Sequence, residues 1–113
     1  MKIGIGVSFA LLLATGGLFL PARGSAQGMD SMTLAVNLGD VLASEAFCGL
    51  AYDQTAIGAF INKNVKAEDM GFTSTLQMMT EGKEIDLEKM SPSAKTAHCV
   101  QIARVARSYG FTK

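Results

Sequence analysis

The chain has 113 residues, of which 49% are hydrophobic and 18% are charged, and its formal net charge at pH 7 is zero. That length is enough for one domain. The balanced charge excludes the strong basic excess that is typical of nucleic-acid-binding proteins, so no nucleic-acid partner is expected.

Residues 1–26 have the pattern of an export signal. Lys2 provides a positive start, residues 3–20 form an apolar run, and Gly24-Ser25-Ala26 places small residues before a cleavage site. We expect cleavage before Gln27, a periplasmic location and no stable membrane insertion afterwards. The alternative is an uncleaved anchor, but four glycines in the apolar run and the small-residue site argue against it.

The charges of the mature chain are unevenly distributed. Without Lys2 and Arg23, 8 basic and 10 acidic residues remain, a net charge of −2. Residues 27–88 hold all ten carboxylates against three lysines, a net of −7, whereas residues 89–113 hold five basic residues and no acid, a net of +5. We expect the two parts to attract each other, either within one chain or between the chains of a salt-sensitive homodimer.

The mature chain is predicted to begin with a flexible segment, residues 27–33, followed by a single helical domain, residues 34–113. Apolar residues at helical spacing predict a first helix from residue 34 to about Phe47, with Gly39 as a weak point. Asp53 is a plausible N-cap of a second helix, whose apolar face comprises Ile57, Phe60, Ile61 and Val65.

The second half of the domain is predicted to contain two further helices. Glu68 and Asp69 favour the start of a third helix, which we expect to end at Gly82. Residues 83–90 are compatible with a turn of helix or an extended connector, and we favour the connector. Ser91 and Pro92 are typical of a helix start and predict a last helix that ends near residue 110. The four amphipathic helices predict an all-α bundle.

Cys48 and Cys99 are both in the mature part, and an even number of cysteines in an exported chain favours a disulfide. The bond would tie the end of the first helix to the early part of the last. On the loop-entropy account, closing a loop of this size stabilises a small domain by roughly 4 kcal/mol. A redox or metal-binding role is disfavoured because no CxxC motif is present.

Catalytic patterns are absent from the sequence. His98 is the only histidine, and a disulfide at Cys99 would exclude a Cys/His nucleophile pair. We therefore expect His98 to be a surface residue or a local hydrogen-bond partner, and the protein not to be an enzyme. The methionines could bind Cu(I), with Met29 and Met32 spaced i, i+3 beside the cleavage site, but core filling and chance surface positions explain them better.

An acidic segment offers an alternative function in metal binding. Glu84, Asp86 and Glu88 alternate close to Glu81, and an extended backbone would project the alternating carboxylates to one side. Oxygen ligands of this kind suit a hard cation such as calcium or a lanthanide, so this segment is a candidate metal site. Glu68 and Asp69 could add ligands, and a second chain could complete the site in a metal-linked dimer. The competing interpretation is a solvated charged connector.

Three segments of the chain resemble small exported helical proteins of alphaproteobacteria. They are residues 45–53 (EAFCGLAYD), 90–99 (MSPSAKTAHC) and 108–111 (SYGF). The resemblance implies an exported helical protein and carries over no catalytic residues. The chain is also similar to acid-stress periplasmic chaperones in size, helical character and disulfide interval, although the sequence around its cysteines departs from theirs.

Together these patterns predict a non-catalytic periplasmic accessory protein that binds other molecules or acts like a chaperone. Acid would protonate its carboxylates, leave the basic last helix uncompensated and expose apolar faces to other proteins. The alternative is the hard-cation-binding protein that uses residues 81–88.

Overall fold

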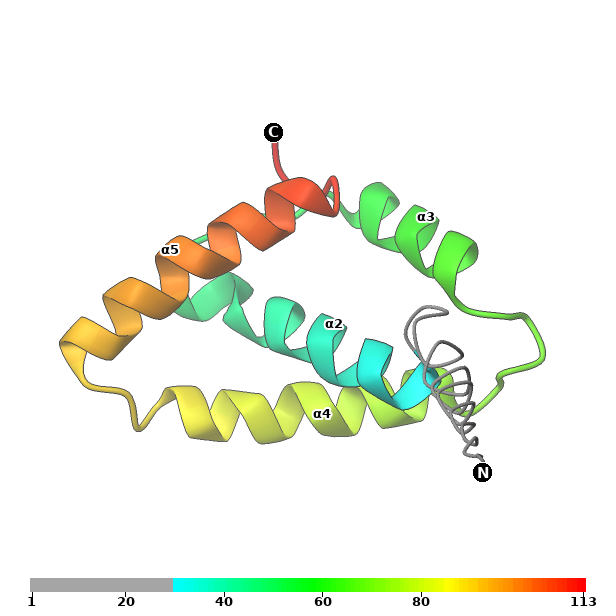
Figure 1. The fold of residues 1–113 in the computed structure, drawn as a ribbon, viewed down its shortest axis with the longest axis horizontal. Coiled ribbons are helices and arrows are strands. Elements are labelled where there is room, and N and C mark those ends of the chain that lie inside the picture. Colours follow the sequence, from blue (N-terminus) through cyan, green and yellow to red (C-terminus); the bar gives the residue numbers. More distant parts are fainter. Residues whose placement is uncertain (1–29) are drawn as a thin grey trace, which may run out of the picture.

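The computed structural model describes residues 30–113, so the expected signal peptide, its cleavage site and residues 27–29 lie outside the described part. Four helices occur between residues 30 and 113, and they lie in the order shown in Figure 1. They are α2 (Ser31–Phe47), α3 (Gln54–Asn64), α4 (Phe72–Leu87) and α5 (Pro92–Ser108). Together with one disulfide, they confirm the predicted all-α bundle for this range.

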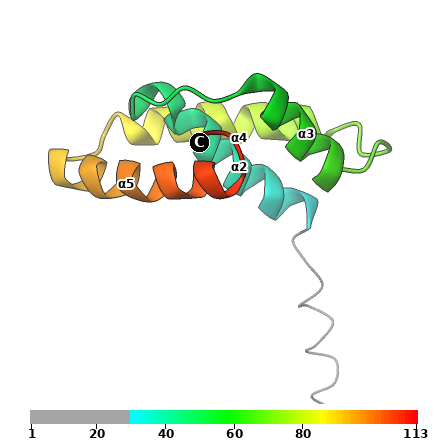
Figure 2. The same cartoon turned by 90° about the horizontal axis from the view of Figure 1, so that it is seen from above.

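Helix α2 is the centre of the bundle. It packs along α4 and also contacts α5. Figure 1 shows α2 and α4 running in the same general direction, while α3 and α5 run back the other way. In the view from above, α2 runs obliquely to α5 (Figure 2). This central position explains why α2 contributes more buried residues than any other described helix.

The core lies where the apolar face of α2 meets the other helices. The buried cluster comprises Leu34, Ala35, Leu38, Val41, Tyr52, Phe72, Leu76, Ile102, Ala106 and Phe111. Gly39 is a point of close approach between α2 and α4. A Cβ atom at Gly39 would lie 3.0 Å from Met79 Cβ and 3.2 Å from the backbone nitrogen of Thr80. The glycine that looked like a weak point of the first helix is therefore a packing contact.

The C-terminal end of the chain folds back into the bundle after α5. Gly110 has a positive φ of 85°, which glycine adopts without the steric cost of a side chain, and it turns the chain so that Phe111 is buried. The amide of Asp53 donates to the carbonyl of Phe111 at 2.9 Å. The Phe111 ring packs against the rings of Tyr52, Phe60 and Tyr109. These aromatic contacts join α3, α5 and the segment before α3.

Two of the predicted helix starts are confirmed. Asp53 caps α3 by accepting hydrogen bonds from the amides of Thr55 and Ala56, and Ser91 caps α5 with Pro92 in the first turn. The first helix begins earlier than expected, at Ser31, because the Asp30 carboxylate accepts a hydrogen bond from the amide of Thr33. The last three residues of the segment predicted to be flexible are thus helical.

Both predicted boundaries of the third helix are wrong. Glu68 and Asp69 lie in a turn, and α4 begins only at Phe72. The helix then continues through Gly82 to Leu87, so residues 83–87 are helical and not an extended connector. Glycine costs a helix about 1 kcal/mol relative to alanine. Burial of Leu87, which is 1% exposed, contributes about 1.5–3 kcal/mol and outweighs that cost. None of the described helices is long and apolar enough to cross a membrane.

Candidate functional site

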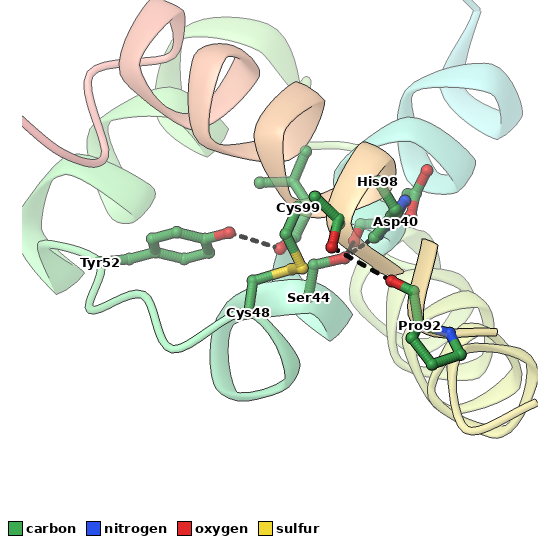
Figure 3. The surroundings of a disulfide bond; sticks show 9 residues. Asp40, Ser44, Cys48, Tyr52, Pro92, His98 and Cys99 are labelled. Atoms are coloured by element: carbon green, nitrogen blue, oxygen red, sulfur yellow. Dashed lines mark hydrogen bonds and ion pairs between the residues drawn. A yellow bond between two sulfur atoms is a disulfide. The ribbon is translucent and has the colours of Figure 1, made fainter. Parts of the chain in front are cut away.

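The disulfide joins the two helices that the sequence predicted it would join. Cys48 directly follows α2 and Cys99 lies in the second turn of α5, with their Cα atoms 5.4 Å apart (Figure 3). The two cysteines of the chain are therefore paired, and neither is a free thiol. The bond links residues 51 positions apart in the sequence. It holds the early part of α5 against the end of α2.

His98 lies beside the disulfide and contacts α2. Its Nε2 atom is 2.8 Å from Ser44 Oγ. Figure 3 draws both residues near the disulfide. Ser44 is fully buried, and its hydroxyl donates to the carbonyl of Asp40 at 2.7 Å. A serine hydroxyl has one proton, so in this arrangement the Nε2–H of His98 donates to Ser44 Oγ. His98 is therefore a local hydrogen-bond partner, one of the two roles expected from the sequence.

Asp40 is the residue at which α2, α4 and α5 converge. Its Oδ1 atom lies 3.6 Å from Lys83 Nζ on α4 and 3.9 Å from His98 Nε2 on α5. This oxygen is buried and has no hydrogen-bond partner in the structure. We call Asp40, Ser44, Lys83 and His98 the polar cluster. The contacts of Asp40 with Lys83 and His98 are longer than hydrogen bonds, so their contribution to stability is modest.

The polar cluster does not have the geometry of a Ser-His-Asp triad. In a triad the serine and the carboxylate contact opposite nitrogens of the imidazole. Here Ser44 and Asp40 both face the same atom, Nε2 of His98. Ser44 is also inaccessible to a substrate, since its side chain is fully buried. The cluster positions helices, and nothing in its geometry activates a nucleophile.

An apolar groove adjoins the polar cluster on the side of α2 and α4. It encloses about 520 Å³ and is lined by Val36 and Asp40 of α2 and by several residues of α4, including Met78, Lys83, Ile85 and Asp86. The side chains of Val36, Met78 and Ile85 are 45%, 63% and 58% exposed. Three large apolar side chains thus face solvent in one hollow, which we call the α2–α4 groove.

The sequence alone did not identify the α2–α4 groove. Met78 and Ile85 are seven residues apart, which places them on one face of a helix, but this spacing is informative only if the helix passes Gly82. Met79 packs against the core, in agreement with core filling as a role of the methionines. Met32 and Met70 are exposed, while Met29 lies outside the described residues.

The structure divides Glu84, Asp86 and Glu88, the alternating acidic residues proposed as metal ligands, between two surfaces. Glu84 and Asp86 are two residues apart on a helix, which turns their side chains about 200° from each other. Accordingly Asp86 lines the α2–α4 groove, whereas Glu84 and Glu88 line a separate hollow beside Phe47. The expected alignment of carboxylates required an extended backbone and is wrong.

The remaining proposed ligands have other surroundings. Glu81 accepts a hydrogen bond from Gln77 at 3.1 Å, and Asp69 accepts one from Ser31 at 2.6 Å. Glu68 is exposed in the turn before α4. Among residues 30–113, no group of three or more histidine, cysteine, aspartate or glutamate residues is placed to hold a metal ion.

Within residues 30–113, no lysine or arginine of the basic part, residues 89–113, forms an ion pair with a carboxylate of the acidic part. In this range Asp40 pairs with Lys83, and its 3.9 Å contact with His98 is ionic only when the imidazole is protonated. Of the five basic residues after Glu88, Lys95 lies over the ring of Phe47, 4.6 Å from its centroid, and none pairs with a carboxylate in the described chain. The basic face of α5 is therefore not neutralised internally.

Among residues 30–113, two groups outside the polar cluster have shifted pKa values. Burial raises the pKa of Tyr52 to about 12, and the nearby carboxylates of Glu45 and Asp40 act in the same direction. The hydroxyl of Tyr52 donates to the carbonyl of Val41 at 2.8 Å. The pKa of Asp30 is lowered because its carboxylate accepts a hydrogen bond from the amide of Thr33.

Comparison with protein-family models, curated proteins and solved structures found no match to this chain.

Proposed function

We propose that this protein is a non-catalytic periplasmic accessory protein that binds other proteins through the α2–α4 groove. The observation that carries this proposal is the gathering of Val36, Met78 and Ile85, all substantially exposed, in one hollow. Grouped apolar side chains that remain in contact with water are typical of surfaces that bind a partner. Methionine adapts its shape readily, which suits a groove that accepts apolar side chains of different shapes.

The charges around the groove define the chemistry of its partner. On α4, helical geometry places Glu81 on one side of the Met78–Ile85 stripe and Asp86 on the other. Lys83 contacts Asp40 and offsets one of the carboxylates at the groove. The partner that fits is a helical segment with an apolar stripe flanked by basic residues. The disulfide supports a location outside the reducing cytoplasm, in agreement with export.

A designed peptide tests this function directly. The probe is a labelled amphipathic helix made of leucine and lysine, titrated with the mature protein and followed by fluorescence anisotropy. We expect saturable binding that weakens as salt is raised, because exposed charge pairs are screened. Met78→Asp should weaken binding by about tenfold or more, since loss of one buried apolar side chain costs about 1.5–3 kcal/mol.

Met70→Asp is the matched control. Met70 is 85% exposed and lies in the turn before α4, outside the groove, so the same substitution there should leave peptide binding unchanged. Far-ultraviolet circular dichroism would establish that both variants are folded. Absence of peptide binding, or equal binding by wild type and the Met78→Asp variant, would overturn the proposed function.

A further inference from the structure

We propose that a second copy of this chain binds in the α2–α4 groove through the exposed face of its own helix α5. This inference rests on the proposed function, because it names the partner of the same groove. The interface would join two different surfaces, the groove of one copy and α5 of the other. Each copy would have one surface of each kind to offer.

The exposed face of α5 offers one large apolar residue and two cations to the groove. Val100 is 58% exposed, and Arg104 and Arg107 follow it at i+4 and i+7, on the same side of the helix. Both arginines are exposed, and so is Ala97 one turn before Val100. The α5 face thus has an apolar residue at its centre and two cations toward its C-terminal end.

The surface of α4 is complementary to this face in charge and polarity. Met78 and Ile85 form an apolar stripe, and the carboxylates of Glu81 and Asp86 lie on its two sides. Val100 of a second copy would contact the apolar stripe while its arginines approach these carboxylates. Arginine suits this role because its guanidinium group can donate two parallel hydrogen bonds to one carboxylate.

The charged side chains that would meet in this interface form no ion pairs within residues 30–113, which favours a contact between two chains. Arg107 makes no ion pair within residues 30–113, and Arg104 has only a 3.5 Å contact with the side chain of Gln101. On α4, neither Glu81 nor Asp86 pairs with a cation in the described chain. The same chain therefore presents two arginines on α5 and, on either side of the Met78–Ile85 stripe, two carboxylates on α4 that lack ion pairs in the described part, and the two sets suit each other.

Sedimentation velocity of the mature protein tests the inference. At low salt we expect an average mass that rises above that of the monomer as protein concentration increases, and a return to monomer at high salt. The double variants Arg104→Glu/Arg107→Glu and Glu81→Lys/Asp86→Lys should each be monomeric at low salt. An equimolar mixture of the two should associate again, because the reversed charges of one copy match those of the other.

Lys63→Glu/Lys66→Glu is the matched control, since it changes the net charge as the arginine variant does but at exposed positions outside both surfaces. It should associate like the wild type. A wild-type protein that stays monomeric at low salt, or charge-reversed variants that fail to associate when mixed, would overturn the inference. Peptide binding in the groove would be unaffected by that result, so failure of self-association is distinguishable from failure of the proposed function.

Discussion

The imidazole of His98 and the buried hydroxyl of Ser44 are 2.8 Å apart, and this hydrogen bond joins α5 to α2 one residue before the disulfide. A disulfide and a hydrogen bond therefore join α5 to α2 from adjacent residues of α5, His98 and Cys99. The polar contact fixes the orientation of His98 toward Asp40, whose carboxylate also faces Lys83 of α4.

Replacement of His98 should destabilise the fold. His98→Ala leaves the hydroxyl of Ser44, which is fully buried, without its donor, so we expect the free energy of unfolding to fall by about 1–3 kcal/mol. Urea unfolding with the disulfide intact would measure the change. In a double-mutant cycle with Ser44→Ala, the losses in free energy of unfolding of the two single variants should sum to more than the loss of the double variant. Simple additivity would show that the contact carries no coupling energy.

Removal of the disulfide should have a larger effect. Cys48→Ala/Cys99→Ala frees a loop between residues 51 positions apart, and we expect a loss of about 2–4 kcal/mol in the free energy of unfolding. Urea unfolding of the double variant, compared with wild type under oxidising conditions, gives this difference. Wild type treated with a reductant serves as the control and should approach the variant. An unchanged unfolding midpoint would contradict the structural role of the bond.

Two glycines on neighbouring helices should respond to alanine in opposite directions. At Gly39 a Cβ atom would meet Met79 and the backbone of Thr80, so Gly39→Ala should cost about 1–3 kcal/mol despite the higher helix propensity of alanine. At Gly82 nothing lies within 4 Å, and Gly82→Ala should stabilise α4 by up to about 1 kcal/mol. Thermal unfolding of both variants would check this, and stabilisation by Gly39→Ala would refute the close helix approach.

Alkaline pH should destabilise the protein through Tyr52. Its pKa in the folded state is raised to about 12 from 10, so between these values the unfolded chain releases a proton that the folded chain retains. The stabilising effect of the bound proton is complete below pH 10 and is lost as pH rises toward 12, at up to about 1.4 kcal/mol per pH unit. The free energy of unfolding, measured at intervals across this range, would reveal the decline.

The matched variants for this measurement are Tyr52→Phe and Tyr109→Phe. Tyr52→Phe removes the hydrogen bond to the carbonyl of Val41, which should cost about 1 kcal/mol at neutral pH, but it should lessen the decline above pH 10. Tyr109→Phe leaves Tyr52 in place and should keep the wild-type slope. If both variants show the same slope as wild type, Tyr52 is not the group responsible.

Much of the fold follows from local signals in the sequence. Asp53, Ser91 and Pro92 mark helix starts because a cap acts within a few residues of its own position. The pairing of Cys48 with Cys99 was predictable because the chain has only two cysteines and resembles an exported protein. The apolar spacing within each segment was sufficient to predict helices without strands.

The limits of prediction appear where distant residues decide a local outcome. Gly82 indicated a helix end by its own propensity, but burial of Leu87 five residues later extends α4 beyond it. That extension separates the carboxylates proposed as metal ligands and creates the face on which Met78 and Ile85 lie. The prediction of a connector failed for this reason, and the proposed metal site depended on it.

The sequence by itself determined the helical class, two of the four helix starts and the disulfide partners, because caps, periodicity and a single cysteine pair act without reference to the rest of the chain. Only the tertiary structure decided that Gly39 is a contact, that Asp40 lies between Lys83 and His98, and that an apolar groove remains open between α2 and α4. These features arise from packing between helices, and the angle and register of that packing depend on the shapes of all the contacting side chains together.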